Sequence, residues 1–304
     1  MEVKFWGTRG SLPTPGADMV RYGGNTSCVQ VTLSDGTHLI LDAGTGIRNL
    51  PPYLGTAGDR IHILLTHLHL DHIQGLLFFP PLFRPEVEVT LWGPSAPGAS
   101  LESRIGRYLS APLTPVEIRE LPCHLDFRNC PRSSWSIGSA EIVAEAVTHR
   151  GPTLGFRIED DGASLCYLPD HEPAIVGSID QLELEWLSGS ALAHDVDLLL
   201  HDAQYTDAEY AAHLGWGHSS VTHTLQFAER VRARRTLFFH HDPSHTDDEL
   251  DEILEDARVR WAERGGAEGA IGMAAEGVEL TVDSGVEQTA AQGGELPLRE
   301  ARGA

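Results

Sequence analysis

Three histidines and one aspartate within six residues constrain this chain more than any other feature of its sequence. They are His67, His69, Asp71 and His72. Just upstream, residues 61–65 are apolar except for one histidine, which predicts a buried strand that runs up to the cluster. In extended backbone His67 and His69 point the same way, because side-chain direction repeats every second residue. We therefore expect four polar side chains to converge at the end of a buried strand.

Neutral imidazole and carboxylate are ligands that zinc and similar divalent metals take in proteins. The alternative is that the four residues lie on a solvated loop without a shared role. Histidine clusters with ligand spacing rarely lack a metal role, so the pattern favours a metal site.

The cluster resembles the His-x-His-x-Asp-His signature of the metallo-β-lactamase superfamily, and four more stretches resemble the other motifs of that family in the same order. Each of these stretches follows a strand-like run. Their motif residues are Asp42 in 41–46, His149 in 147–149, Asp170 in 167–170, and His240 or His241 in 237–243. The order and spacing fit from about residue 1 to residue 283.

The resemblance implies two divalent metal ions held by two sets of ligands that share one carboxylate. The first set is His67, His69 and His149, the second is Asp71, His72 and His240, and Asp170 bridges the two. A water or hydroxide completes the bridge. Two ions ~3.5–4 Å apart bind a substrate oxygen and generate hydroxide at neutral pH. Zinc is the first expectation, and manganese and iron accept the same ligands.

Several of these residues have an ordinary alternative. His149 taken alone reads as a loop or core histidine, and Asp170 as a turn aspartate, but both stand where a strand closes. His240 is preferred over His241 because the strand 236–239 ends directly before it. Asp42 is expected to hold a histidine ring or the motif loop instead of binding the metal.

Two further elements resemble phosphodiesterase branches of the family such as ribonuclease Z. Residues 215–220 resemble the His-Ser-Thr element, and residues 200–203 resemble the His-Glu-Ala element. The resemblance implies that Asp202 orients His218, which stabilises the transition state or protonates the leaving oxygen. We assign catalytic roles to these two residues and to Asp71. The alternative for His218 is an exposed residue beside an N-cap serine.

Strand-like and helical patterns alternate in two similar halves. This matches the fold that the resemblance implies, an α/β αββα sandwich of two β-sheets with outer helices. Expected strands cover 2–6, 28–33, 37–41, 61–66, 86–91, 141–147, 154–158, 163–168, 197–201, 236–239 and 277–282. Expected helix starts are Ser100, Thr206, Ser219 or Ser220, and Thr246. One domain over 1–283 and a disordered tail over 284–304 complete the expectation.

Composition bears on location and partners. The 304 residues carry a net charge of −22, which disfavours polymeric nucleic acid because such binding relies on basic side chains. A small anionic substrate stays compatible, since a metal site sets its own local charge. The start of the chain lacks a signal-like apolar run and no stretch reaches the length of a membrane span, so we expect a cytoplasmic protein. The sequence leaves a homodimer open.

The favoured function is a dinuclear metal-dependent phosphodiesterase for a small substrate such as a cyclic nucleotide. A lactonase, thioesterase or other ester hydrolase is the first alternative, because the fold does not fix the substrate. A di-iron redox protein or a metal-bound sensor module is the second. That reading requires a flavin domain or partner, which this sequence does not supply.

Overall fold

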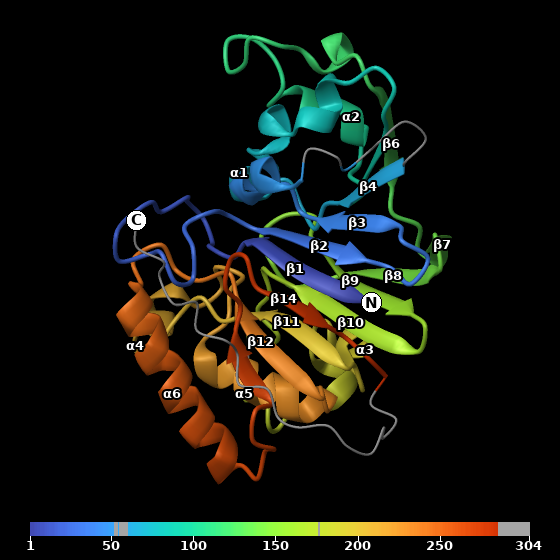
Figure 1. Ribbon diagram of the computed structural model, residues 1–304. Coiled ribbons are helices and arrows are strands. Elements are labelled where there is room, and N and C mark those ends of the chain that lie inside the picture. The colour runs from blue at the N-terminus through green and yellow to red at the C-terminus, as the bar shows by residue number, and fades with distance from the viewer. Residues whose placement is uncertain (52–53, 55–59, 176, 285–304) are drawn as a thin grey trace.

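The computed structural model describes residues 1–51, 54, 60–175 and 177–284. Within these residues the chain builds two seven-stranded sheets that pack face to face, with helices on the outside (Figure 1). The αββα sandwich predicted from the sequence is therefore confirmed. The predicted tail lies outside the described residues except for Ser284, and the single domain over 1–283 stays a prediction.

The first sheet has the strand order β14-β1-β2-β3-β4-β5-β6. Its strands are β1 (Glu2–Gly7), β2 (Cys28–Thr32), β3 (His38–Leu41), β4 (Arg60–Leu64), β5 (Glu88–Gly93), β6 (His124–Asn129) and β14 (Glu279–Thr281). β2 and β3 form an antiparallel hairpin around the Asp35-Gly36 turn, whereas β3 to β6 run parallel. The parallel strands bring their carboxyl ends to one edge of the sheet.

The second sheet has the order β13-β12-β11-β10-β9-β8-β7. Its strands are β7 (Trp135–Ile137), β8 (Ala140–Ala146), β9 (Leu154–Asp160), β10 (Ala163–Leu168), β11 (Leu198–Asp202), β12 (Arg235–Phe239) and β13 (Ile271–Met273). β10, β11 and β12 are parallel and fully buried apart from the first residue of β12. Their mostly apolar sequences are typical of parallel strands covered on both faces.

Four of the helices in the described residues begin where the capping residues predict, and α1 and α3 were not predicted. The helices are α1 (Leu70–Ile73), α2 (Leu101–Gly106), α3 (Ser190–Ala193), α4 (Asp207–His213), α5 (Val221–Val231) and α6 (Asp247–Glu263). Short 3₁₀ turns are η1 (Thr45–Asn49), η2 (Leu76–Phe78), η3 (Pro80–Phe83), η4 (Ile118–Glu120) and η5 (Leu184–Trp186). Ser100 and Ser220 cap α2 and α5, and Thr206 and Thr246 form capping boxes at α4 and α6.

Three apolar clusters hold these layers together. One lies between the sheets around Phe5, Tyr167 and Phe239. A second joins the second sheet to α3, α5 and α6, and a third joins the first sheet to the turns and to α2. Each fully buried large apolar side chain contributes roughly 1.5–3 kcal/mol relative to an exposed one. Rigid sheets packed on both faces fix the strand ends that carry the polar motifs.

The structure corrects parts of the sequence expectation. β6, β7 and β13 were not expected, and the helix expected to start at Ser100 runs to Gly106. The four cysteines are free thiols. Among the described residues no helix has the length and apolar character needed to cross a membrane. The cytoplasmic location and the homodimer stay predictions.

Candidate metal centre

The predicted site residues meet at the carboxyl ends of parallel strands from both sheets. His67 follows β4, Asp170 follows β10, and His240 follows β12. Asp71 and His72 lie on α1, which is the next helix after β4 in the chain. Strands that end at the same edge of the sandwich place residues far apart in sequence side by side. The structure thus brings together the seven residues predicted as ligands.

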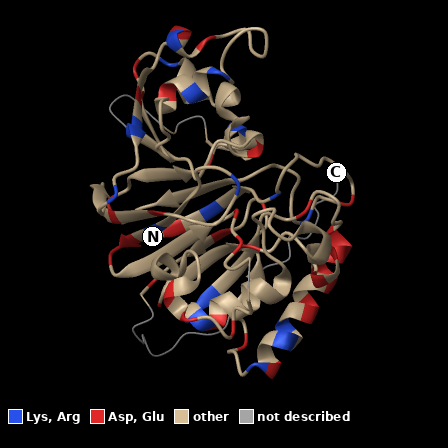
Figure 2. Cartoon of the chain, turned by 180° about the vertical axis from the view of Figure 1, so that it is seen from behind, with Lys and Arg blue, Asp and Glu red and all other residues tan. Residues whose placement is uncertain are grey.

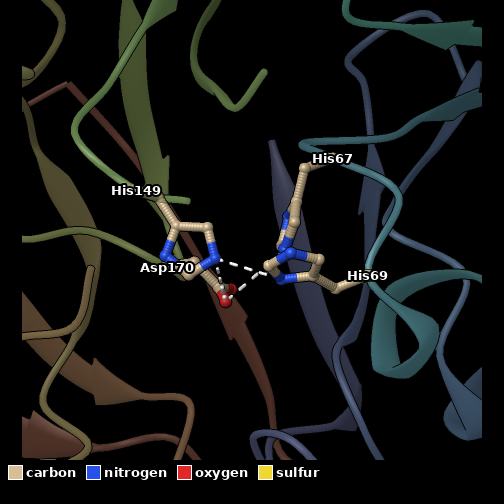
Figure 3. Close-up of side chains that lie close together, drawn as sticks. All are labelled: His67, His69, His149 and Asp170. Atoms are coloured by element: carbon tan, nitrogen blue, oxygen red, sulfur yellow. Dashed lines mark hydrogen bonds and ion pairs between the residues drawn. The ribbon is translucent and has the colours of Figure 1, made fainter. Parts of the chain in front are cut away.

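The first cluster contains His67, His69, His149 and Asp170 (Figure 3). Asp170 Oδ2 lies 3.7 Å from His67 Nε2 and 3.6 Å from His149 Nε2. His69 Nδ1 lies 3.2 Å from His149 Nε2. One nitrogen or oxygen from each of the four side chains therefore faces a common point.

The second cluster contains Asp71, His72, Asp170 and His240. Here the other carboxylate oxygen of Asp170, Oδ1, lies 3.0 Å from His72 Nε2 and 3.3 Å from His240 Nε2. Asp71 Oδ2 lies 3.3 Å from His72 Nε2 and 3.2 Å from His240 Nε2. Asp170 thus presents one oxygen to each cluster, which is the arrangement a bridging ligand requires.

Both clusters hold buried polar atoms that fit a metal ion. Nε2 of His67 is buried without a hydrogen-bond partner, and Nε2 of His72 and Oδ1 of Asp170 are buried and make no hydrogen bond although they lie 3.0 Å apart. A buried polar atom without a partner costs about 1–3 kcal/mol, so such atoms are rare unless an ion or water satisfies them. The donor set, imidazole and carboxylate, suits a divalent metal such as zinc. The described residues therefore fit the metal ions that the sequence implies.

The electrostatics of the clusters agree with this fit. Burial, followed by the neighbouring His72, lowers the pKa of His67 well below its usual value, which keeps a neutral ligand nitrogen. Burial alone would raise the pKa of Asp170, but the facing histidines hold it well below its usual range. Burial opposes charge on His72 as well, yet the carboxylates of Asp170, Asp71 and Asp42 raise its pKa. A divalent cation would neutralise this concentration of carboxylates.

Asp42 contacts the motif loop and the ring of His72, as expected for a residue that does not bind the metal itself. Its carboxylate is fully buried and accepts from His72 Nδ1 at 2.8 Å, which leaves His72 Nε2 for the cluster. It also accepts from the backbone N–H of Thr66 at 2.8 Å and from the Tyr167 hydroxyl at 3.0 Å. Such contacts fix the tautomer and the direction of a ligand histidine.

His240, and not His241, enters the second cluster. His240 has a left-handed backbone (φ 59°), and its ring lies against Gly10, where an added Cβ would approach Nδ1 to 2.4 Å. Its Nδ1 lies 3.2 Å from Gln204 Oε1. His241 Nε2 instead bonds to the carbonyl oxygen of Ala274 at 2.8 Å, outside the cluster. This register agrees with the preference for His240 drawn from the sequence.

Asp202 and His218 form a pair beside the clusters. His218 Nδ1 lies 2.7 Å from Asp202 Oδ2, so the short aspartate side chain reaches the ring. Although burial favours the neutral ring, the charge and hydrogen bond of Asp202 raise the pKa of His218 to about 9. The His218 ring stacks on His240 with centroids 5.0 Å apart and lies 4.9 Å from His149. The pair therefore stands next to residues of both predicted ligand sets.

Sequence reasoning missed three polar residues that support the site. The side-chain oxygen of Gln204 lies 3.2 Å from His240 Nδ1. The backbone N–H of Ser11 donates to Asp71 Oδ2 at 2.8 Å. Glu172 is fully buried and accepts from the backbone N–H groups of Gly215 and Gly217, the loop that leads to His218. Of these three residues, only Glu172 had a local sequence signal, because it follows Asp170 by two residues.

The comparisons with known proteins agree with this geometry. The family model described as "Beta-lactamase superfamily domain" matches residues 37–241. Ribonuclease Z of Haloarcula marismortui is 25% identical, over 93% of this chain and 97% of its own length. The solved structure of the metallo-beta-lactamase fold protein YhfI from Bacillus subtilis is 18% identical, covers 92% of this chain and 99% of its own, and has a TM-score of 0.65. A diphosphatase from the PhnP family is also 18% identical, covers 92% and 96%, and has a TM-score of 0.63.

These relatives correct one expectation. The prediction that polymeric nucleic acid is disfavoured receives no support, because curated relatives matched along nearly the whole chain are named ribonuclease Z. Acidic side chains do gather along α6 (Figure 2). Net charge acts at long range, however, while the metal centre sets the local potential that a phosphate meets.

The predicted hydrolase fold and metal-binding character are confirmed. The chain therefore belongs to the β-lactamase superfamily of metal-dependent hydrolases and is similar to its ribonuclease Z branch.

Proposed function

We propose that this chain is a dinuclear metal-dependent phosphodiesterase that acts on a small anionic substrate, such as a cyclic nucleotide. The observation that carries the proposal is the Asp202–His218 pair beside two ligand clusters that share Asp170. The names ribonuclease Z and diphosphatase, borne by relatives of this chain, denote cleavage at phosphorus. The geometry gives no comparable support to lactone or thioester cleavage, which become outcomes of the test.

The predicted ligands divide between two ions, preferably zinc. His67, His69 and His149 would hold one, Asp71, His72 and His240 the other, and Asp170 would serve both. Bound there, two divalent ions would polarise a phosphoryl oxygen and lower the pKa of water to about 7.

The residues around the clusters supply orientation and proton transfer. Asp202 engages Nδ1 of His218 and so fixes which ring nitrogen is left for substrate. Among the described residues no hydrogen bond occupies His218 Nε2, although the ring is largely buried. In the proposed reaction His218 donates a hydrogen bond or proton to the leaving oxygen of the phosphodiester. Asp202 itself acts only through the imidazole.

The first experiment is a substrate panel on metal-reconstituted protein. It compares bis(4-nitrophenyl) phosphate, cyclic nucleotides, a precursor transfer RNA, a lactone and a thioester. We expect turnover of the phosphodiesters and little turnover of the lactone and thioester. Cleavage of the RNA but of no small diester would keep the phosphodiesterase activity and overturn the small-substrate proposal.

Two histidine variants test the proposed role of His218. His218→Ala should keep its metal and lose phosphodiesterase turnover by roughly 10²–10⁴-fold, the usual range for a positioned acid–base group. His194→Ala is the matched control, because that half-exposed histidine pairs with Asp195 away from the clusters. If lactones or thioesters are the good substrates and His218→Ala is silent, the proposal is wrong.

A further inference from the structure

An exposed tryptophan lies on the loop that contacts the predicted ligand His149 and leads to His218. Trp216 precedes Gly217, whose carbonyl oxygen lies 2.7 Å from His149 Nδ1. Gly217 packs so tightly that an added Cβ would lie 2.4 Å from the same nitrogen. His218 follows directly. In the sequence, Trp216 is next to the residue that contacts a predicted ligand and two residues before the proposed proton donor. Even so, 51% of Trp216 is exposed.

The loop that carries Trp216 is held in place by hydrogen bonds to a buried carboxylate. The buried carboxylate of Glu172 accepts from the N–H of Gly215 at 2.9 Å, the N–H of Gly217 at 2.9 Å and the hydroxyl of Tyr210 at 2.6 Å. Both glycines beside Trp216 have positive φ, 79° and 91°, which other residues rarely adopt. The proposed chemistry does not use Glu172. The three hydrogen bonds that Glu172 accepts instead fix the position of the loop that carries Trp216.

A cation lies beside the same ring. The guanidinium carbon of Arg150 is 5.9 Å from the centroid of Trp216, and Arg150 directly follows His149. Within the described part of the chain no carboxylate forms an ion pair with Arg150. An aromatic ring and a guanidinium without an ion-pair partner, beside a centre proposed to bind phosphate, are the two groups that bind a planar base and its phosphate.

We propose that Trp216, with Arg150 beside it, forms a stacking site for the base of a nucleoside phosphodiester whose phosphate lies at the metal centre. This inference rests on the proposed function and names its substrate class. A platform held in advance by Glu172 loses little conformational freedom when the base stacks on it. Stacking on an aromatic side chain is tolerant of base identity, so the site selects nucleosides over sugars without strong base preference.

The test compares the binding of adenosine 5′-monophosphate and ribose 5-phosphate, which differ by the base alone. Isothermal titration on zinc-reconstituted protein gives both dissociation constants without any turnover. The wild type should bind the nucleotide about 5- to 140-fold more tightly, or about 1–3 kcal/mol at 1.4 kcal/mol per tenfold. Trp216→Ala should bring the ratio near one, and Trp216→Phe should restore most of it. Trp186→Ala, which removes another exposed tryptophan, should leave the ratio unchanged.

The outcomes separate this inference from the proposed function. Equal binding of the two ligands by the wild type, or an unchanged ratio in Trp216→Ala with normal zinc content, overturns the stacking site. Phosphodiester turnover would then still support the proposed function. A ratio that depends on Trp216 in a protein that hydrolyses no phosphodiester supports the base site and leaves the proposed reaction refuted.

Discussion

Replacing Asp42 with asparagine tests how the motif loop holds the metal ligands. Four donors converge on the Asp42 carboxylate: His72 Nδ1 at 2.8 Å, the Thr66 N–H at 2.8 Å, the Thr66 hydroxyl at 3.0 Å and the Tyr167 hydroxyl at 3.0 Å. Asparagine keeps the shape but offers one acceptor oxygen and an NH₂ group that faces donors. About two of the buried donors lose their acceptor, at about 1–3 kcal/mol each, so the free energy of unfolding should fall by about 2–6 kcal/mol.

Metal affinity should fall as well, because the His72 ring loses the contact that orients it. The usual loss for such an outer contact is 10–100-fold, or about 1.4–2.8 kcal/mol. Tyr167→Phe is the matched control, since it removes one donor from Asp42 and leaves the contact with His72 intact. Urea denaturation of metal-free protein measures the first effect, and zinc competition against a chromophoric chelator measures the second. Wild-type zinc affinity in Asp42→Asn, or an equal loss in Tyr167→Phe, would refute the reasoning.

Two further predictions concern histidines. His240→Ala should lose the second metal ion and most activity. His241→Ala should lose less, because His241 bonds to a backbone carbonyl outside the clusters. Elemental analysis and turnover measurements that rank the two variants in the reverse order would contradict the assignment. Burial lowers the pKa of His201 to about 4, so between about pH 6.5 and 4 the unfolded chain binds more protons at this residue than the folded chain does. As the pH falls through that window, His201 should lower the free energy of unfolding by up to about 3 kcal/mol. Urea titrations of His201→Phe should show a flatter pH slope than the wild type, and an equal slope would count against the assignment.

The fold was largely predictable because its signals are local. Apolar runs marked the buried strands, and Thr206 and Thr246 marked helix starts through capping boxes that form as expected. β13 escaped because three residues, Ile271–Met273, are too short to show a period. β6 does alternate, with Leu125 and Phe127 on one face, but it follows a stretch rich in proline, which interrupts regular patterns.

The candidate site was predictable to the extent that its residues stand in motifs at strand ends. Ser11 and Gln204 do not, since both are common polar residues whose contacts join segments far apart in the chain. The reach of Asp202 to His218 could not be judged from residue type either. Sequence shows that the side chain is one carbon shorter than glutamate, while the backbones of β11 and the loop before α5 decide whether 2.7 Å is achieved.

The central claim is a two-ion centre whose halves share Asp170, and metal stoichiometry tests it most directly. Asp170 gives Oδ2 to the first cluster and Oδ1 to the second, so its loss should weaken both. We expect about two zinc ions per chain in reconstituted wild-type protein and reduced occupancy of both positions in Asp170→Ala. A wild-type content of at most about one ion per chain after reconstitution, or an Asp170→Ala variant that keeps full occupancy, would contradict the account.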